Sequence, residues 1–183
     1  MWRALGVFLQ GLATAQSGAP SGGLEDMRRG VELLREQNVL IFDGLFKIAL
    51  AEAEARTGDL GRAVAILDEA LATSERIGHR AFEAELQRAR GEMLLKRDPA
   101  NPAPAEEAFQ AAIAVAQQQG TRSFGLRAAL SLARLYQSTG RPVEAHDILA
   151  PALEGFSPTP EMPVIEEAQA LLAALAEEMA KFP

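Results

Sequence analysis

Apolar residues recur every three or four positions from Leu45 to Gly78, the spacing that predicts two amphipathic helices. Gly58 is expected to end the first helix, Asp59 to cap the second, and Gly78 to end it. The apolar positions are Phe46, Leu50, Ala53 and Ala55 in the first helix and Ala63, Ile66, Leu67, Ala70 and Leu71 in the second, whereas Lys47, Glu52 and Arg56 fall on the opposite side of the first. The stretch therefore predicts a helical hairpin.

Small residues repeat along the chain in a fixed frame. Ala63, Ala70, Leu71 and Gly78 have counterparts at the same spacing, offset by 40 or 42 residues: Gly23, Gly30, Val31 and Asn38; Ala105, Ala112, Ile113 and Gly120; Ala145, Ala152, Leu153 and Pro160. The preceding helix of each unit has its own small residues, at Gly11, Ala51, Gly91 and Ala133, and in three units also at Gly18, Gly58 and Gly140. Such residues let two helices approach closely, so the frame predicts stacked hairpins of about forty residues, a solenoid.

The frame divides the chain into repeats at about 1–38, 39–78, 79–120 and 121–160, followed by a capping helix at 161–181, all within a single domain over residues 1–183. SGAPSGG, residues 17–23, is expected to be a flexible loop in the first hairpin, and the prolines of DPANPAP, residues 98–104, forbid helix there. The first stretch also has features of a signal peptide, namely Arg3, an apolar run over 4–12 and Ala13-Thr14-Ala15. Gly11 in phase and the polar Gln10 favour a first helix instead, and hence a cytoplasmic chain.

The composition of the chain argues against several classes of site and partner. The chain is 48% hydrophobic with a mean hydropathy of −0.01, and only 5% of its residues are aromatic, which suits packing by alanine and leucine in helices. It has no cysteine, so disulfides and thiolate metal sites are excluded. A net charge of −7 argues against nucleic acid or an acidic membrane as the main partner, and no segment has the length of a transmembrane span. We expect no cofactor and no metal.

The sequence gives little sign of catalysis. His79 and His146 are the only histidines; they fall in different units and lack the neighbours of a metal site, so we interpret both as surface residues. The acidic residues resemble ordinary helix surface, with Glu52 and Arg56, Arg88 and Glu92, and Glu92 and Lys96 as weak ion pairs one turn apart. We therefore expect a protein that is not an enzyme.

The hairpins resemble elongated tetratricopeptide (TPR) repeats, most closely in the series Leu132, Ala133, Tyr136, Gly140, Ala145, Leu149 and Ala152. The resemblance implies a right-handed α-α superhelix of four helical hairpins plus a C-terminal capping helix. More narrowly, phrases such as GLEDMRRGVELLR, LAEAEARTGDLGRAVAILDEAL and LRAALSLARLYQSTGR resemble the C-terminal repeats of bacterial signalling proteins with adenylate/guanylate cyclase and AAA-type ATPase domains. Similar repeats follow the ATPase domains of large LuxR-type transcription regulators. The chain has no phosphate-binding loop and no paired aspartates of a cyclase, so it resembles the repeat region alone.

In TPR-like solenoids the first helices of successive hairpins line the concave face. Carried over by phase, this predicts a partner-binding groove of Phe8, Leu12, Gln16, Ile48, Glu52, Arg56, Arg88, Glu92, Lys96, Leu130, Arg134 and Gln137, apolar in the first unit and of mixed charge beyond it. The predicted function is a non-catalytic protein-interaction module in bacterial signal transduction that binds a protein or peptide segment.

Three alternatives remain open. The chain is either a stand-alone module or a piece acting in cis on an upstream cyclase or ATPase domain. In the second case, Trp2, Leu5, Val7 and Phe8 form an apolar face that upstream helices cover. The same exposed first hairpin also allows a homodimer, and a small-molecule sensor is the further alternative.

Overall fold

The computed structural model describes residues 2–17, 20–159 and 161–180, and within these ranges all regular structure is helical. The helices are α1 (Trp2–Gln16), α2 (Pro20–Glu36), α3 (Asp43–Arg56), α4 (Leu60–Ile77), α5 (Glu83–Arg97), α6 (Ala103–Gln119), α7 (Arg122–Ser138), α8 (Pro142–Leu153) and α9 (Pro163–Met179). The predicted all-α class is confirmed. Two landmarks of the repeat frame, Gly18 and Pro160, lie outside the described residues.

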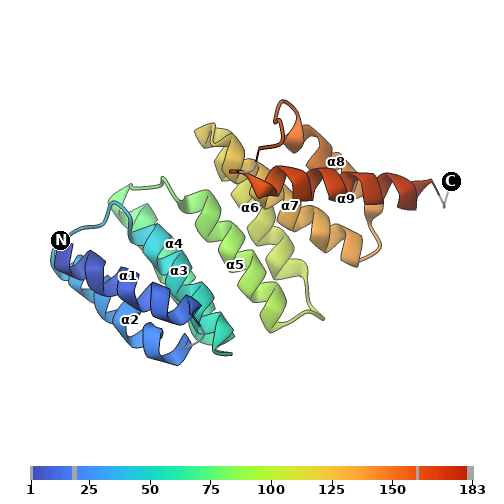
Figure 1. The fold of residues 1–183 in the computed structure, drawn as a ribbon. Helices are drawn as coiled ribbons and strands as arrows, with labels where there is room; N and C mark the ends of the chain where they lie inside the picture. Colours follow the sequence, from blue (N-terminus) through green and yellow to red (C-terminus); the bar gives the residue numbers. More distant parts are fainter. Residues whose placement is uncertain (1, 18–19, 160, 181–183) are drawn as a thin grey trace.

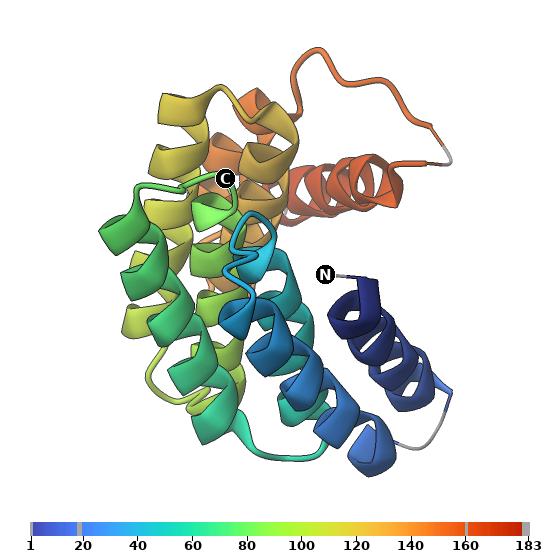
Figure 2. The ribbon, with the colours of Figure 1, turned by 90° about the vertical axis from the view of Figure 1, so that its left-hand side faces the viewer.

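Consecutive helices pair as hairpins, α1 with α2, α3 with α4, α5 with α6 and α7 with α8, and each hairpin stacks on the next (Figure 1). The first helices α1, α3, α5 and α7 also contact one another in order, and α9 packs against α7 and α8 as the predicted capping helix. In the view of Figure 2, α1 and α9 lie on the same side of the stack. The solenoid therefore has one face made of first helices, with α9 crossing its C-terminal end.

The predicted turns have the expected local chemistry. Gly78 ends α4 with φ 71°, and Asn38, at the matching position after α2, has φ 54°. These left-handed conformations satisfy the last carbonyl groups of each helix. Asp59 caps α4, since its side-chain oxygen accepts a hydrogen bond from the Arg62 backbone N–H at 2.9 Å.

The first hairpin is tightest where glycines face each other. A Cβ on Gly11 would lie 2.6 Å from the Gly23 carbonyl oxygen, and one on Gly30 would lie 2.6 Å from Phe8 Cβ. The frame of small residues therefore marks real helix crossings. The expected loop over 17–23 is wrong for residues 20–23, because α2 begins at Pro20 and Gly23 lies in the crossing. Pro104, in the segment expected to be non-helical, lies in the first turn of α6, where proline is tolerated.

The core runs along the seam between first and second helices. Leu67 and Leu149, predicted to be buried, have no exposed surface. Lys47, predicted on the polar side of its helix, is buried instead, and its ammonium lies 3.4 Å from Asp43 Oδ2 and 3.2 Å from Glu69 Oε1. Two carboxylates bring this lysine into the hairpin, an arrangement that the period of the helix cannot reveal.

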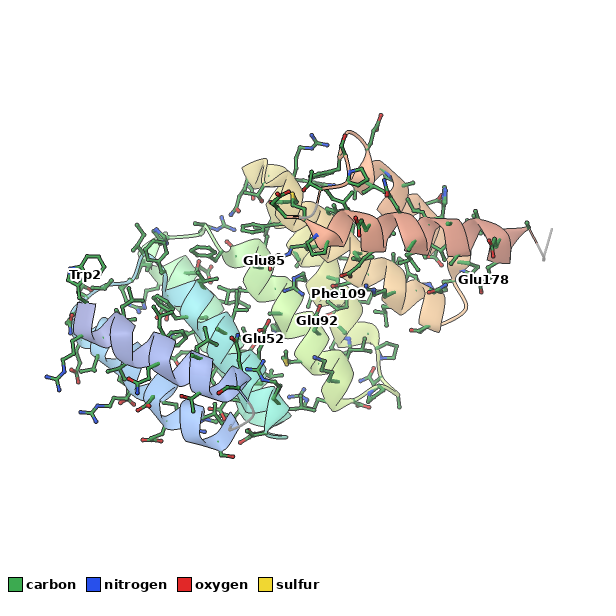
Figure 3. All side chains as sticks on the ribbon, viewed as in Figure 1. Trp2, Glu52, Glu85, Glu92, Phe109 and Glu178 are labelled. Atoms are coloured by element: carbon green, nitrogen blue, oxygen red, sulfur yellow. The ribbon has the colours of Figure 1, made fainter. Side chains whose placement is uncertain are left out.

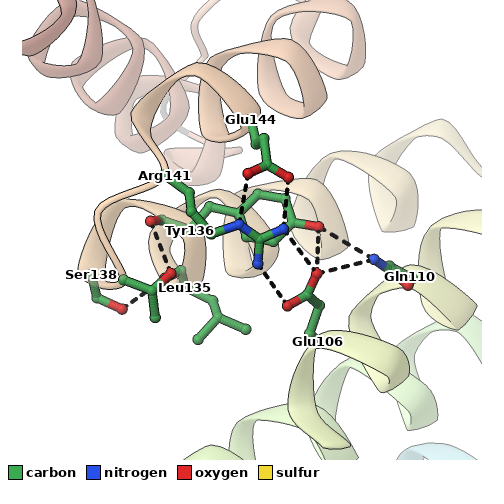
Figure 4. Close-up of polar contacts among 8 residues, drawn as sticks. Glu106, Gln110, Leu135, Tyr136, Ser138, Arg141 and Glu144 are labelled. Atoms are coloured by element: carbon green, nitrogen blue, oxygen red, sulfur yellow. Dashed lines mark hydrogen bonds and ion pairs between the residues drawn. The ribbon is translucent and has the colours of Figure 1, made fainter. Parts of the chain in front are cut away.

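Polar clusters link one hairpin to the next. Tyr136 Oη donates to Glu106 Oε1 at 2.9 Å, and Arg141 contacts Glu106 at 2.8 Å and Glu144 at 2.6 Å (Figure 4). The Arg141 guanidinium also lies 3.9 Å from the centroid of the Tyr136 ring. This arrangement lowers the pKa of Glu106, chiefly through its hydrogen bonds from Arg141. The cluster holds α6 against the turn between α7 and α8.

Candidate partner-binding face

A cleft of about 370 Å³ opens on the first-helix face between α5, α7 and the start of α9. Four of the predicted groove residues line it together: Arg88, Glu92, Leu130 and Arg134. The other predicted residues lie on α1, α3 or the ends of α5 and α7, outside this cleft. The structure thus brings together the third and fourth units of the predicted groove.

Three predicted groove residues are core residues. Phe8, Ile48 and Leu130 are all buried, and Phe8 stacks on Phe46 of α3 with ring centroids 4.8 Å apart. Together with Arg88 they occupy one position of the repeat frame, at spacings of 40, 40 and 42 residues. This position is turned toward the neighbouring helices, and of its four residues only Arg88 and Leu130 line the cleft. The prediction that Phe8 and Ile48 are presented on the groove surface is wrong.

The remaining predicted residues differ in exposure. Gln16, Arg56, Lys96 and Arg134 are exposed, whereas Leu12, Glu52, Arg88, Glu92 and Gln137 are partly buried. The sequence reasoning missed further cleft residues: Ser123, Phe124, Arg127 and Ser131 on α7, Glu161 and Met162 just before α9, and Pro163, Val164 and Glu167 on α9. Arg127 could have been found, because it lies seven residues before Arg134 and therefore on the same side of α7.

The charges in the cleft are paired across three helices. Arg88 contacts Glu92 at 2.6 Å, which confirms that predicted pair, and it also contacts the buried Glu85 at 3.2 Å. Arg127 reaches Glu85 from α7 at 3.0 Å, and Ser131 Oγ donates to Glu92 Oε1 at 3.1 Å. At the rim, Arg134 pairs with Glu167 of α9 at 2.7 Å. Figure 3 labels Glu85 and Glu92, which lie along α5.

Glu52 of α3 lies at the edge of the same network. Burial raises the pKa of its carboxyl, and the positive charge of Arg88 opposes that change. Within the described part of the chain the Glu52 carboxylate makes no hydrogen bond or close ion pair, although Arg56 and Lys96 influence it at longer range. Burial would lower the pKa of Arg88, but Glu92 and Glu85 outweigh it and raise the pKa, so the guanidinium stays charged.

The described ranges offer few residues for a metal site or for catalysis by histidine. They contain no cluster of three or more potential metal-ligating histidine and acidic side chains. His79 is partly buried in the turn before α5, and His146 is partly buried beside Asp147 on α8. Across residues 2–17, 20–159 and 161–180, no helix is both long enough and apolar enough to cross a membrane.

Comparison with solved structures identifies the fold. The chain is similar to the nearly identical TPR-like repeats of a protein described as a kinesin light chain from Podosopora anserina, with a TM-score of 0.73 and 18% identity over 98% of this chain and 88% of that one. A variant of the same protein gives a TM-score of 0.74 and 17% identity over the same shares. No protein-family model and no curated protein sequence matches the chain. The protein therefore has the fold of a TPR-like repeat solenoid.

Proposed function

We propose that the chain is a non-catalytic interaction module that binds a segment of a partner protein along its first-helix face. The TPR-like fold generally mediates protein-protein interaction. The observation that supports this face is the cleft between α5, α7 and α9, whose rim carries the half-exposed guanidinium groups of Arg127 and Arg134. On binding, charged side chains of the partner then compete with the ion pairs already present in the cleft.

The setting that we propose is bacterial signal transduction in the cytoplasm. It rests on the resemblance of GLEDMRRGVELLR and the other phrases to the repeats of cyclase and ATPase signalling proteins. The partner segment then belongs either to another protein or to a cyclase or ATPase domain acting in cis. A homodimer through the first hairpin is the alternative that the same experiments address.

A small-molecule sensor is the second candidate, because the cleft volume of about 370 Å³ lies within the range of ligand pockets, about 300–1,000 Å³. Its lining of alternating arginine and glutamate side chains would suit a zwitterion. A thermal-shift screen of free amino acids would test this, since a ligand that binds only the folded state raises the melting temperature. A screen without any such rise would exclude amino acids as the ligand.

The variant that tests the face must remove its charges without unfolding the chain. Arg88 is a poor choice, because its side chain is mostly buried and it donates most of the hydrogen bonds that the buried Glu85 accepts, whereas Arg127 donates only one. Arg127 and Arg134 are half-exposed, so Arg127→Ala/Arg134→Ala is suitable. The matched control is Arg29→Ala/Arg76→Ala, which removes two exposed arginines from the second helices α2 and α4.

The experiment is a quantitative pull-down from native lysate with the intact chain, the cleft variant and the control as baits. We expect partners that the intact chain and the control retain and that the cleft variant loses. Circular dichroism of all three baits verifies equal helix content. If every retained protein binds the cleft variant equally well, the first-helix cleft is not the binding surface.

A further inference from the structure

Large exposed apolar side chains gather at the N-terminal end of the first-helix face. Trp2 is 77% exposed and Leu9 49% on α1, while Phe42 and Leu45, at the start of α3, are 48% and 47% exposed. With the partly buried Leu5 these residues form what we call the apolar shelf. Isolated exposed apolar residues are ordinary, whereas several of them on the neighbouring helices α1 and α3 indicate an interaction site.

The repeat frame places the shelf on the same face as the cleft. Four residues of α7 that line the cleft are Phe124, Arg127, Ser131 and Arg134. The equivalent positions of α3, 82 residues earlier, are Phe42, Leu45, Ala49 and Glu52. Those of α1, 122 residues earlier, are Trp2, Leu5, Leu9 and Leu12. Equivalent positions of stacked repeats point the same way. The face that is charged on α5 and α7 is therefore apolar on α1 and the first half of α3.

A preceding hairpin would pack against a largely different side of α1. On α3, the residues packed toward the first hairpin are Phe46, Ala49, Leu50 and Ala53. Their equivalents on α1, 40 residues earlier, are Gly6, Leu9, Gln10 and Ala13, of which only Leu9 has a large apolar side chain. By this equivalence a preceding hairpin would reach Leu9 but not Trp2 or Leu5, so most of the shelf is suited to a partner lying in the groove.

Glu52 supplies the chemical selectivity. It lies seven residues after Leu45 on α3, so its carboxylate stands about 10 Å farther along the face, at 1.5 Å per residue. It is partly buried and receives no hydrogen bond within the described part of the chain, although the positive charges of Arg88, Arg56 and Lys96 act on it from farther away; the nearby Glu92 is paired with Arg88. A cationic side chain from a partner would satisfy it, and the net charge of −7 favours approach by a basic segment.

We propose that the apolar shelf and Glu52 together bind a basic amphipathic segment of a partner protein, an inference that rests on the proposed function of the first-helix face. Large apolar side chains of the segment cover Trp2, Leu9 and Leu45, and a lysine or arginine contacts Glu52. A spacing of about 10 Å between the apolar side chain and the basic side chain of the segment corresponds to about seven residues if the segment is helical or about three if it is extended.

The test is selection of random 16-residue peptides displayed on phage against the full chain, followed by measurement of Kd for the enriched peptides. We expect enriched sequences with large apolar residues followed by lysine or arginine at one of these two spacings. Trp2 is the only tryptophan, so its emission should shift to shorter wavelength when a tryptophan-free peptide covers it. No enriched peptide, or a consensus of acidic residues, would overturn the proposal.

Two substitutions with matched controls assign the contacts. Leu9→Glu should weaken the selected peptides at least about tenfold, because it places a charge against their apolar anchors. The matched control is Val143→Glu, which changes a similarly exposed apolar residue on α8 and should alter Kd by less than about twofold. Glu52→Gln should weaken the basic peptide but not its lysine-to-methionine version, whereas Glu177→Gln on α9 should affect neither.

The outcomes separate this inference from the proposed function. If the peptides bind Leu9→Glu normally but no longer bind the Arg127→Ala/Arg134→Ala variant, the binding site is the cleft, and the proposal that the shelf binds them is refuted. Peptides indifferent to both variants would refute the first-helix face as well. If Trp2 emission shifts with protein concentration alone and sedimentation gives twice the chain mass, a second copy covers the shelf and the proposal fails.

Discussion

Two glycines of α1 should respond in opposite directions to the same substitution. Gly11 lies in the crossing with α2, where an added Cβ would be 2.6 Å from the Gly23 carbonyl oxygen and 2.7 Å from the Met27 backbone nitrogen. Gly6 lies in the same helix, and a Cβ added there would have nothing within 4 Å. Gly6→Ala is therefore the matched control for Gly11→Ala.

The magnitudes follow from two terms. Replacing a helical glycine by alanine stabilises the helix by about 0.5–1 kcal/mol. At Gly11 this gain is opposed by overpacking, which costs about 1–3 kcal/mol, because the two nearest atoms are backbone atoms of α2 that cannot rotate away as a side chain would. We expect Gly6→Ala to raise the free energy of unfolding by about 0.5–1 kcal/mol and Gly11→Ala to lower it by about 1–2 kcal/mol.

Urea unfolding followed by circular dichroism at 222 nm measures both values. The first hairpin is held by a second core cluster, in which Phe8, Leu24 and Met27 pack with Leu50 and Ala53 of α3, so it can open before the rest of the solenoid. Hydrogen exchange of α1 and α2 therefore accompanies the urea titration and should be faster in Gly11→Ala. If Gly11→Ala raises the urea midpoint as Gly6→Ala does, the two helices do not cross at Gly11.

Two further predictions concern the core and pH. Leu67→Ala should cost about 2–5 kcal/mol in chemical denaturation because Leu67 has no exposed surface, whereas Val143→Ala should change stability by less than about 0.5 kcal/mol. The pKa of Glu106 is lowered in the folded chain, so its contribution is present above the unfolded pKa of about 4.3 and is lost as pH falls below it. Glu106→Gln should therefore make thermal stability less dependent on pH between about 5 and 3 than in the intact chain, while the exposed Glu107→Gln should not.

The helices and turns could be predicted from the sequence because they depend on neighbours in the chain. The spacing of Ala63, Leu67 and Ala70 reports one face of one helix, and Gly78 and Asp59 act on the backbone next to them. The hairpin contacts could also be predicted, since a glycine such as Gly11 or Gly23 marks a close approach wherever its partner lies. Small residues therefore revealed the crossings that apolar periodicity alone leaves open.

The groove was predicted only in part, because the pattern of apolar residues around one helix does not show on which side the next hairpin packs. Phe8 and Leu9 are adjacent, yet one is buried against α3 and the other exposed on the shelf. The ion pairs of Arg127 with Glu85 and of Arg134 with Glu167 join residues 42 and 33 positions apart. Such contacts depend on how hairpins stack, and no local pattern specifies that geometry.

The pairing of charges in the cleft bears on where binding energy can arise. A partner that engages Arg88 or Glu92 must replace an existing ion pair, so the net gain is small even when the new contact is good. The shelf has no such competitor, since Trp2, Leu9 and Leu45 give up only contact with water when they are covered. Affinity is then expected to come chiefly from the apolar end of the face. Selectivity comes from Glu52, because a partner without a donor would leave that partly buried carboxylate without a hydrogen bond.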